Sequence, residues 1–216
     1  MDRQACVDLG AITGNVAAMC ERVRGSQVMA VVKADGYGHG MIPAARAALA
    51  GGATWLGTAD LTEALALRAA GITAPVLCLM AIGEPTDAIR AGIDVTASSV
   101  AVVTQVAEAA ARAGVPARLH LEADTGLSRG GATRAGWPAV VQAALAAQAA
   151  GRLRVVGLWS HLACADLPGH PSVAAQLAAF ADAVAHAEQA GVTPEVRHIA
   201  NTAGALTVPE CRLDLV

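Results

Sequence analysis

The sequence predicts an α/β fold, specifically a (β/α)8 TIM-like barrel that is incomplete at its C-terminal end. Short β-rich runs alternate regularly with longer, alanine-rich runs of helical period along the 216 residues. This alternation indicates a parallel sheet with helical crossovers. The strand-like runs are apolar on both faces, as expected for parallel strands that helices cover. About eight strands within roughly 200 residues favour closure into a barrel over an open, doubly wound sheet.

The individual elements follow from the same pattern. The first strand is expected at 27–33 and is preceded by a helix over 12–23, for which Asp8 or Thr13 can serve as the N-cap. Further strands are expected at 54–58, 75–80, 93–96, 117–123, 153–160, 196–200 and 213–216. Helices are expected between them at 41–50, 61–70, 84–91, 100–113, 137–150 and 172–190. These helices end directly before Gly51, Gly71, Gly92, Gly114, Gly151 and Gly191, where helices favour glycine. No helix follows the eighth strand in this sequence.

The composition excludes several classes of function. The formal net charge of −3 is too small, and of the wrong sign, for a protein that binds nucleic acid by neutralising phosphates. The content of 55% hydrophobic residues excludes a disordered chain. No uncharged run reaches the roughly 20 apolar residues of a membrane span. The N-terminus lacks the apolar core of a secretion signal, so we expect a cytoplasmic protein.

The sequence predicts neither disulfides nor a metal site. Its five cysteines are widely spaced and include no C-x-x-C pair, which is typical of reduced core residues. His161 with His170 or His198 could be considered as ligands, but their spacing does not match known zinc motifs. No linker or charge block divides the chain, so we expect one domain over 1–216.

Polar residues gather just after four of the expected strands. They lie at 33–40, 124–131, 160–166 and 200–204. In a parallel barrel these loops share one rim, where such folds build their sites. The four segments are therefore expected to converge on one pocket.

Each side chain in this pocket has two interpretations. Lys33 ends an apolar strand, so either its ammonium points into the barrel mouth, where a desolvated amine can attack a carbonyl, or it reaches solvent. Arg129 is either a solvated loop cation or the partner of Glu122. His161 is either a core histidine or a ligand contact. Asn201 and Thr202 either cap a short helix or offer donors to a phosphate.

Four segments together resemble one known family. Residues 30–40 read AVVKADGYGHG and closely resemble the pyridoxal-phosphate attachment segment of bacterial alanine racemases. Residues 124–131 (DTGLSRGG), 160–166 (SHLACAD) and 200–202 (ANT) resemble three further motifs of that family, in the same order. The similarity covers the whole chain.

The resemblance implies a barrel that holds pyridoxal 5′-phosphate covalently. Lys33 would be the Schiff-base lysine and one of the two proton-transfer bases. Tyr37 and Thr202 would bind the phosphate, with Asn201 in the same region. The remaining two contacts would be Arg129 to the phenolic oxygen of the cofactor and His161 against its pyridine ring. Glu122 occupies a place where many members carry a carbamylated lysine that pairs with this arginine, and we hypothesise that the glutamate supplies the same negative charge.

Racemisation needs a second base, because one lysine cannot easily reach both faces of a planar carbanion. In the family this base is a tyrosine from a C-terminal β domain, presented across a dimer interface. That domain is absent from 1–216, so we expect the chain to be the N-terminal part of a longer homodimeric enzyme and to be inactive alone. The resemblance implies alanine as the substrate and D-alanine supply for peptidoglycan as the role. The alternatives are a serine or broad-specificity racemase, and a single-domain, non-catalytic protein of pyridoxal-phosphate homeostasis.

Overall fold

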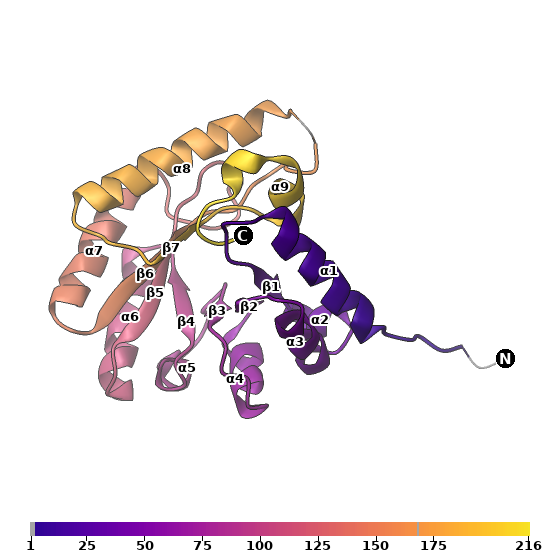
Figure 1. Cartoon of the computed structure of the whole chain (residues 1–216). Coiled ribbons are helices and arrows are strands. Elements are labelled where there is room, and N and C mark those ends of the chain that lie inside the picture. The colour runs from indigo at the N-terminus through magenta and orange to yellow at the C-terminus, as the bar shows by residue number, and fades with distance from the viewer. Residues whose placement is uncertain (1–2, 168) are drawn as a thin grey trace.

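A computed structural model describes residues 3–167 and 169–216. Seven parallel strands form one sheet in chain order, and helices connect and cover them (Figure 1). The strands are β1 (Met29–Val31), β2 (Trp55–Thr58), β3 (Val76–Cys78), β4 (Asp94–Ala97), β5 (Ala117–Glu122), β6 (Leu153–Trp159) and β7 (Val196–His198). This order confirms the predicted class of an incomplete α/β barrel.

Of the helices in the described residues, seven occupy the predicted places with small shifts of their ends, and two short ones, after β1 and β7, lie in segments expected as polar loops. The helices are α1 (Leu9–Arg22), α2 (Lys33–Tyr37), α3 (Met41–Ala50), α4 (Leu61–Ala69), α5 (Thr86–Arg90), α6 (Val100–Ala113), α7 (Trp137–Ala149), α8 (Pro171–Gln189) and α9 (Thr202–Thr207), followed by the 3-10 turn η1 (Pro209–Cys211). Asp8, rather than Thr13, caps α1, because its side chain accepts a hydrogen bond from the Ala11 N–H. Within the described residues, no helix is long and apolar enough to cross a membrane.

The eighth predicted strand, 213–216, is present as a single parallel bridge between Gln27 and Leu215. Its backbone nevertheless reaches both neighbours. The Leu215 N–H donates to the carbonyl of Arg197 in β7 at 3.3 Å, and the Gln27 N–H donates to the carbonyl of Asp214 at 2.9 Å. This segment therefore joins β7 to the chain that leads into β1.

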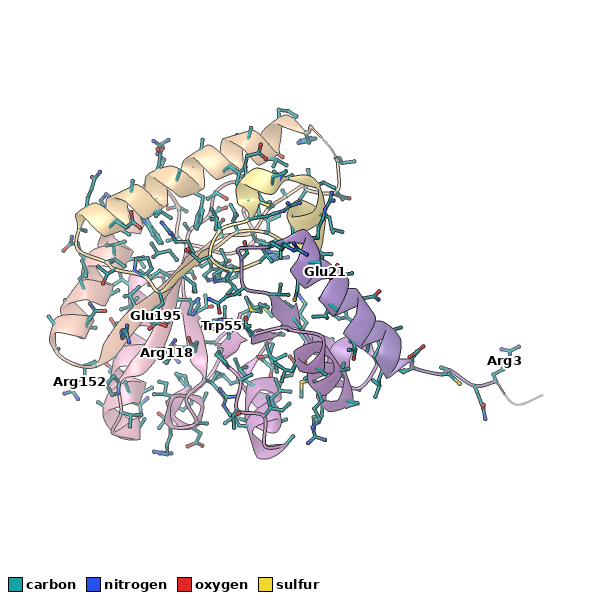
Figure 2. The ribbon with its side chains drawn as sticks, viewed as in Figure 1. Arg3, Glu21, Trp55, Arg118, Arg152 and Glu195 are labelled. Atoms are coloured by element: carbon teal, nitrogen blue, oxygen red, sulfur yellow. The ribbon has the colours of Figure 1, made fainter. Side chains whose placement is uncertain are left out.

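Two layers of side chains hold the barrel together. Between sheet and helices lies an aliphatic layer that includes Leu56, Leu67, Leu119 and Leu158, all fully buried. Inside the ring of strands lie aromatic rings instead. Trp55, labelled in Figure 2, lies edge-on to His120, and Trp159 is stacked on His198. Gly157 makes room for this inner layer, because a β-carbon there would overlap the His120 ring.

The predicted helix-ending glycines behave as expected with one exception. Gly71, Gly92, Gly114, Gly151 and Gly191 all have positive φ angles, which helix C-termini use to end the hydrogen-bonding pattern. Gly51 has an ordinary φ of −80°. It is required for another reason, since a β-carbon there would lie 2.5 Å from the Thr13 carbonyl oxygen where α1 packs on α3.

The prediction for the first strand is wrong at its end. A strand over 27–33 was expected to carry Lys33 as its last residue, but β1 ends at Val31 and Lys33 begins α2. The chain leaves the sheet there because Ala34, Asp35, Gly36 and Tyr37 adopt positive φ angles that no strand accommodates.

Candidate functional site

Lys33 lies two residues beyond the carboxyl end of β1 and is the only lysine among the 216 residues. It is half-buried, and its ammonium nitrogen lies 6.0 Å from the centroid of the Tyr37 ring. The turn that follows is a short left-handed coil, with φ near +52° at Ala34 and Asp35 and +56° at Tyr37. Left-handed geometry costs about 1–2 kcal/mol for each residue with a β-carbon, so the surrounding structure must hold this turn in place.

The turn is tied to the start of α3 by its own polar groups. The carboxylate of Asp35 accepts the N–H of Met41 at 2.7 Å. The N–H of Gly36 donates to the carbonyl of Val32 at 2.8 Å, and that of Gly40 to the carbonyl of Asp35 at 2.9 Å. A β-carbon at Gly36 would press on Ala44 and Met41, which explains glycine at this close approach.

A cavity of about 530 Å³ lies beside this turn. Side chains and backbone of α1, β1, α3 and α9 line it, together with Val216. Its polar lining includes Tyr37, His39, His198, Asn201 and Thr202. Asn201 also caps α9, since its side-chain oxygen accepts the N–H of Gly204 at 2.9 Å, as the capping interpretation predicts. Its role toward a phosphate stays a prediction.

The loop after β5 presents Arg129 at an exposed tip. Asp124 shapes the loop by accepting the N–H groups of Gly126 and Ser128, both at 3.0 Å. Glu122 lies behind it, and burial raises the pKa of its carboxyl to about 7, although the positive charge of Arg129 acts in the opposite direction. The ion pair considered between Glu122 and Arg129 is not formed within the described structure. Arg129 is exposed, and the Glu122 carboxylate sits close to Gly130.

His161 follows β6 and is held through its backbone by a residue that the sequence analysis missed. Gln176 of α8 is only 2% exposed and donates to the carbonyl of His161 at 3.1 Å, while its oxygen accepts the N–H of Ala163 at 2.8 Å. The pKa of His161 is lowered by burial and by the positive charges of Arg129 and Lys33. The electrostatic field of this part of the rim therefore favours a neutral imidazole and an anionic ligand.

A chain of buried polar residues runs through the barrel and was also missed. His198 shares a hydrogen bond of 3.1 Å with His120, whose other ring nitrogen lies 3.2 Å from the carboxylate of Asp94. Because a carboxylate only accepts, a neutral His120 carries its proton on Nε2 and accepts the Nε2–H of His198. Asp94 also pairs with Arg118 at 2.8 Å, which in turn binds Glu195 (Figure 2). Polar residues inside otherwise apolar strands were the available signal.

The structure thus brings the predicted residues together unevenly. Tyr37, Asn201 and Thr202 line one cavity, and Lys33 adjoins it through Tyr37. His161 does not line that cavity, but the positive charge of Lys33 contributes to lowering its pKa. Arg129 lies at the exposed tip of its loop. Among the residues that the structure describes, no group of three or more histidine, cysteine, aspartate or glutamate side chains could hold a metal ion.

A parallel barrel whose polar side chains lie on loops at the carboxyl ends of its strands has the architecture of the barrel enzymes. Residues 7–216 match the family described as alanine racemase, N-terminal domain. The chain belongs to this family.

Individual relatives agree with this assignment. The alanine racemase of Thermobifida fusca is 58% identical over 215 residues, which are 99% of this chain and 58% of that protein. The solved structure of alanine racemase from Streptomyces coelicolor A3(2) is 54% identical, with a TM-score of 0.95 over 97% of this chain and 57% of that one. Alanine racemase from Bacillus anthracis, solved with bound L-Ala-P, is 31% identical, with a TM-score of 0.87 over 97% of this chain and 54% of that one. The chain therefore spans a little over half the length of the relatives it matches.

Proposed function

We propose that this chain holds pyridoxal 5′-phosphate, and that the protein to which it belongs interconverts L- and D-alanine. The observation that carries the proposal is the position of Lys33. The only lysine of the chain lies just beyond the carboxyl end of β1, beside a cavity lined by Tyr37, Asn201 and Thr202, in a member of the alanine racemase family. A cavity of about 530 Å³ is within the usual range for small-molecule sites.

The donor set suits this cofactor. Lys33 supplies the amine that binds the aldehyde carbon covalently. The hydroxyl groups of Tyr37 and Thr202, with Asn201 beside them, hold the phosphate. Arg129 would hold the phenolic oxygen once its exposed side chain turned inward, and His161 would contact the pyridine ring. When bound, pyridoxal phosphate supplies an electron sink that stabilises negative charge at the substrate Cα.

The chain's own amine then serves as one of two bases. Lys33 removes or returns the Cα proton on one face of the substrate, and a second base from another part of the protein serves the opposite face. We propose that this second base comes from a further domain across a homodimer interface. The wider setting we propose is the cytoplasm, where the D-alanine formed is used for peptidoglycan.

Glu122 is proposed to neutralise Arg129 once that side chain turns inward. This pairing is supported by the positive charge of Arg129, which acts to lower the pKa of Glu122. If Glu122→Gln leaves both cofactor affinity and the ordering of Arg129 unchanged, this part of the proposal is wrong.

Racemisation assays test the function. In the protein comprising this chain and its continuation, Lys33→Ala is expected to lower kcat/KM for L-alanine by at least about a thousandfold, because a catalytic nucleophile and base is lost. Residues 1–216 alone are expected to be inactive, and their racemisation of alanine would refute the need for a second base. A higher kcat/KM for L-serine would favour the broader racemase. Covalent binding of the cofactor without racemisation in the whole protein would favour the non-catalytic alternative.

A further inference from the structure

The left-handed turn after Lys33 needs an external restraint. Three of its residues with β-carbons, Ala34, Asp35 and Tyr37, have φ angles of +52°, +52° and +56°. Such conformations persist only where surrounding contacts determine them. The bonds of Asp35 to α3 restrain the far end of the turn, but they do not reach the first residue after Lys33.

Glu63 of α4 supplies the restraint at the near end. One oxygen of its carboxylate accepts the N–H of Ala34 at 2.6 Å, and the other accepts the N–H of Ala59 at 2.8 Å. Ala59 directly follows β2, the strand that pairs with β1. A single carboxylate therefore ties the residue after Lys33 to the neighbouring strand end.

This arrangement departs from the ordinary use of glutamate at a helix start. Asp60 caps α4 by accepting the N–H of Glu63 at 2.9 Å, and Glu63 occupies the third helical position. In a capping box this glutamate would return to the N–H of the capping residue itself. Here the Glu63 carboxylate instead accepts the N–H of Ala59, which precedes the capping residue, and the N–H of Ala34 in the turn after β1. It therefore restrains that turn as well as the start of its own helix.

We propose that Glu63 is a positioning residue that holds the Lys33 turn in its left-handed form and thereby sets the direction of the Lys33 amine. The inference rests on the proposed function, in which that amine binds pyridoxal phosphate. Glutamine has the same shape as glutamate, but its amide offers one acceptor oxygen and one donor NH2 group. In Glu63→Gln, one of the two N–H groups loses its acceptor and faces another donor.

The test measures covalent labelling of Lys33 in the purified chain. The amine condenses with the aldehyde of pyridoxal phosphate and releases water, and borohydride then delivers hydride to the carbon of the C=N bond, which makes the label permanent. Peptide mass spectrometry after limited reaction times gives the labelling rate. Glu63→Gln is expected to lower this rate about tenfold, because a hydrogen bond to a charged group is lost. The matched control is Glu84→Gln, which removes an exposed carboxylate that accepts the Thr86 N–H in the loop after β3. That control is expected to label like the unsubstituted chain.

A rescue separates positioning from general destabilisation. Glycine adopts positive φ angles without the cost that a β-carbon imposes, so Ala34→Gly is expected to restore labelling of Glu63→Gln to within about threefold. A merely structural role of Glu63 would not be rescued at this position. Amide hydrogen exchange tests the same contact in the unsubstituted chain. There the Ala34 N–H is expected to exchange about as slowly as that of Ala59.

The outcomes are distinct. Equal labelling rates for the unsubstituted chain and Glu63→Gln would overturn this inference and leave the proposed function standing. Slow labelling that Ala34→Gly does not restore would overturn the positioning role. If Glu63→Gln does not fold, rapid exchange of the Ala34 amide in the unsubstituted chain would still overturn it. Absence of any Lys33 label in the unsubstituted chain would overturn the proposed function, and this inference with it.

Discussion

Glu122 shows how one partly buried carboxyl makes the rim of the barrel sensitive to pH. Burial raises its pKa from 4.5 to about 7 in the folded chain. The unfolded chain therefore loses this proton at lower pH than the folded chain does. Between about pH 4.5 and 7 the folded state binds more protons at this residue, and the contribution of Glu122 to stability falls as the pH rises.

Glu122→Gln should remove this dependence. At pH 8 the variant is expected to be more stable than the unsubstituted chain by about 1–2 kcal/mol, after allowance for solvent screening, and at pH 4 the difference should vanish. Urea unfolding of both proteins at pH 8 and pH 4 measures this difference in the free energy of unfolding. A difference that is independent of pH would show that the pKa of Glu122 is the same in the folded and unfolded chain.

The buried chain of Asp94, His120 and His198 is the second residue-scale feature. Asp94→Asn keeps the shape but puts a neutral amide beside Arg118 and His120. We expect a loss of about 3 kcal/mol of stability, because the partly buried Arg118 loses a charge partner and His120 loses its acceptor. Asp87→Asn, which breaks the exposed pair with Arg90, should cost less than about 0.5 kcal/mol. Similar losses in the two variants, measured by urea unfolding, would contradict this account.

At the scale of elements, α8 holds two loops of the site through one side chain. Gln176 bonds to the backbone on both sides of Leu162, and its NH2 group also lies 3.3 Å from the hydroxyl of Thr125 in the loop after β5. Thr125 in turn shares a hydrogen bond with Ser160 at 2.7 Å. The loops that carry His161 and Arg129 are therefore coupled through α8.

Gln176→Leu should loosen both loops. We expect a loss of about 2 kcal/mol in stability, because buried donors and acceptors are left without partners, and faster hydrogen exchange at the Ala163 amide. Gln189→Leu at the exposed end of the same helix is the control and should change neither quantity. Unchanged exchange at Ala163 in Gln176→Leu would show that the loop does not depend on this side chain.

The elements themselves were largely predictable from sequence, because alternating periodicity and helix-ending glycines act locally. The exceptions had non-local causes. Lys33 leaves the first strand because contacts with α3 and Glu63 hold a left-handed turn that no local pattern favours. Gly51 ends α3 with an ordinary negative φ, and its lack of a side chain serves the packing of α1 against α3, which only the distance to Thr13 reveals.

For the candidate site, the loops were predictable from the sequence, whereas the residues that support them were not. The four loops were found because polar residues interrupt apolar strands, and the parallel topology then places them at one rim. The supporting residues, Glu63, Gln176 and Asp94, were missed because their partners lie far away in sequence. A Glu122–Arg129 pair across the rim was plausible from the sequence, but in the structure Arg129 is exposed and Glu122 is partly buried, and Arg129 acts on that carboxyl through its charge alone.

At the scale of the whole molecule, the last four residues connect the two ends of the sheet. The Met29 N–H donates to the Val216 carbonyl at 2.8 Å, and the Val216 N–H donates to the Gln27 carbonyl at 3.0 Å. One bridge connects Gln27 to Leu215, while β5 and β6 pair over six residue pairs. The cavity beside Lys33 opens next to this junction, with Val28 and Val216 both in its lining. Ligand binding there is therefore expected to stabilise the junction, since it favours the folded state by mass action.

The most direct test of the central claim is the location of the covalent label after pyridoxal phosphate and borohydride treatment of this chain. Lys33 provides its only side-chain amine, so the account predicts a single modified peptide containing residue 33, apart from any label on the N-terminal amine. Lys33→Arg is expected to abolish that peptide. Label confined to the N-terminus, or equal retention of cofactor by Lys33→Arg, would contradict the account.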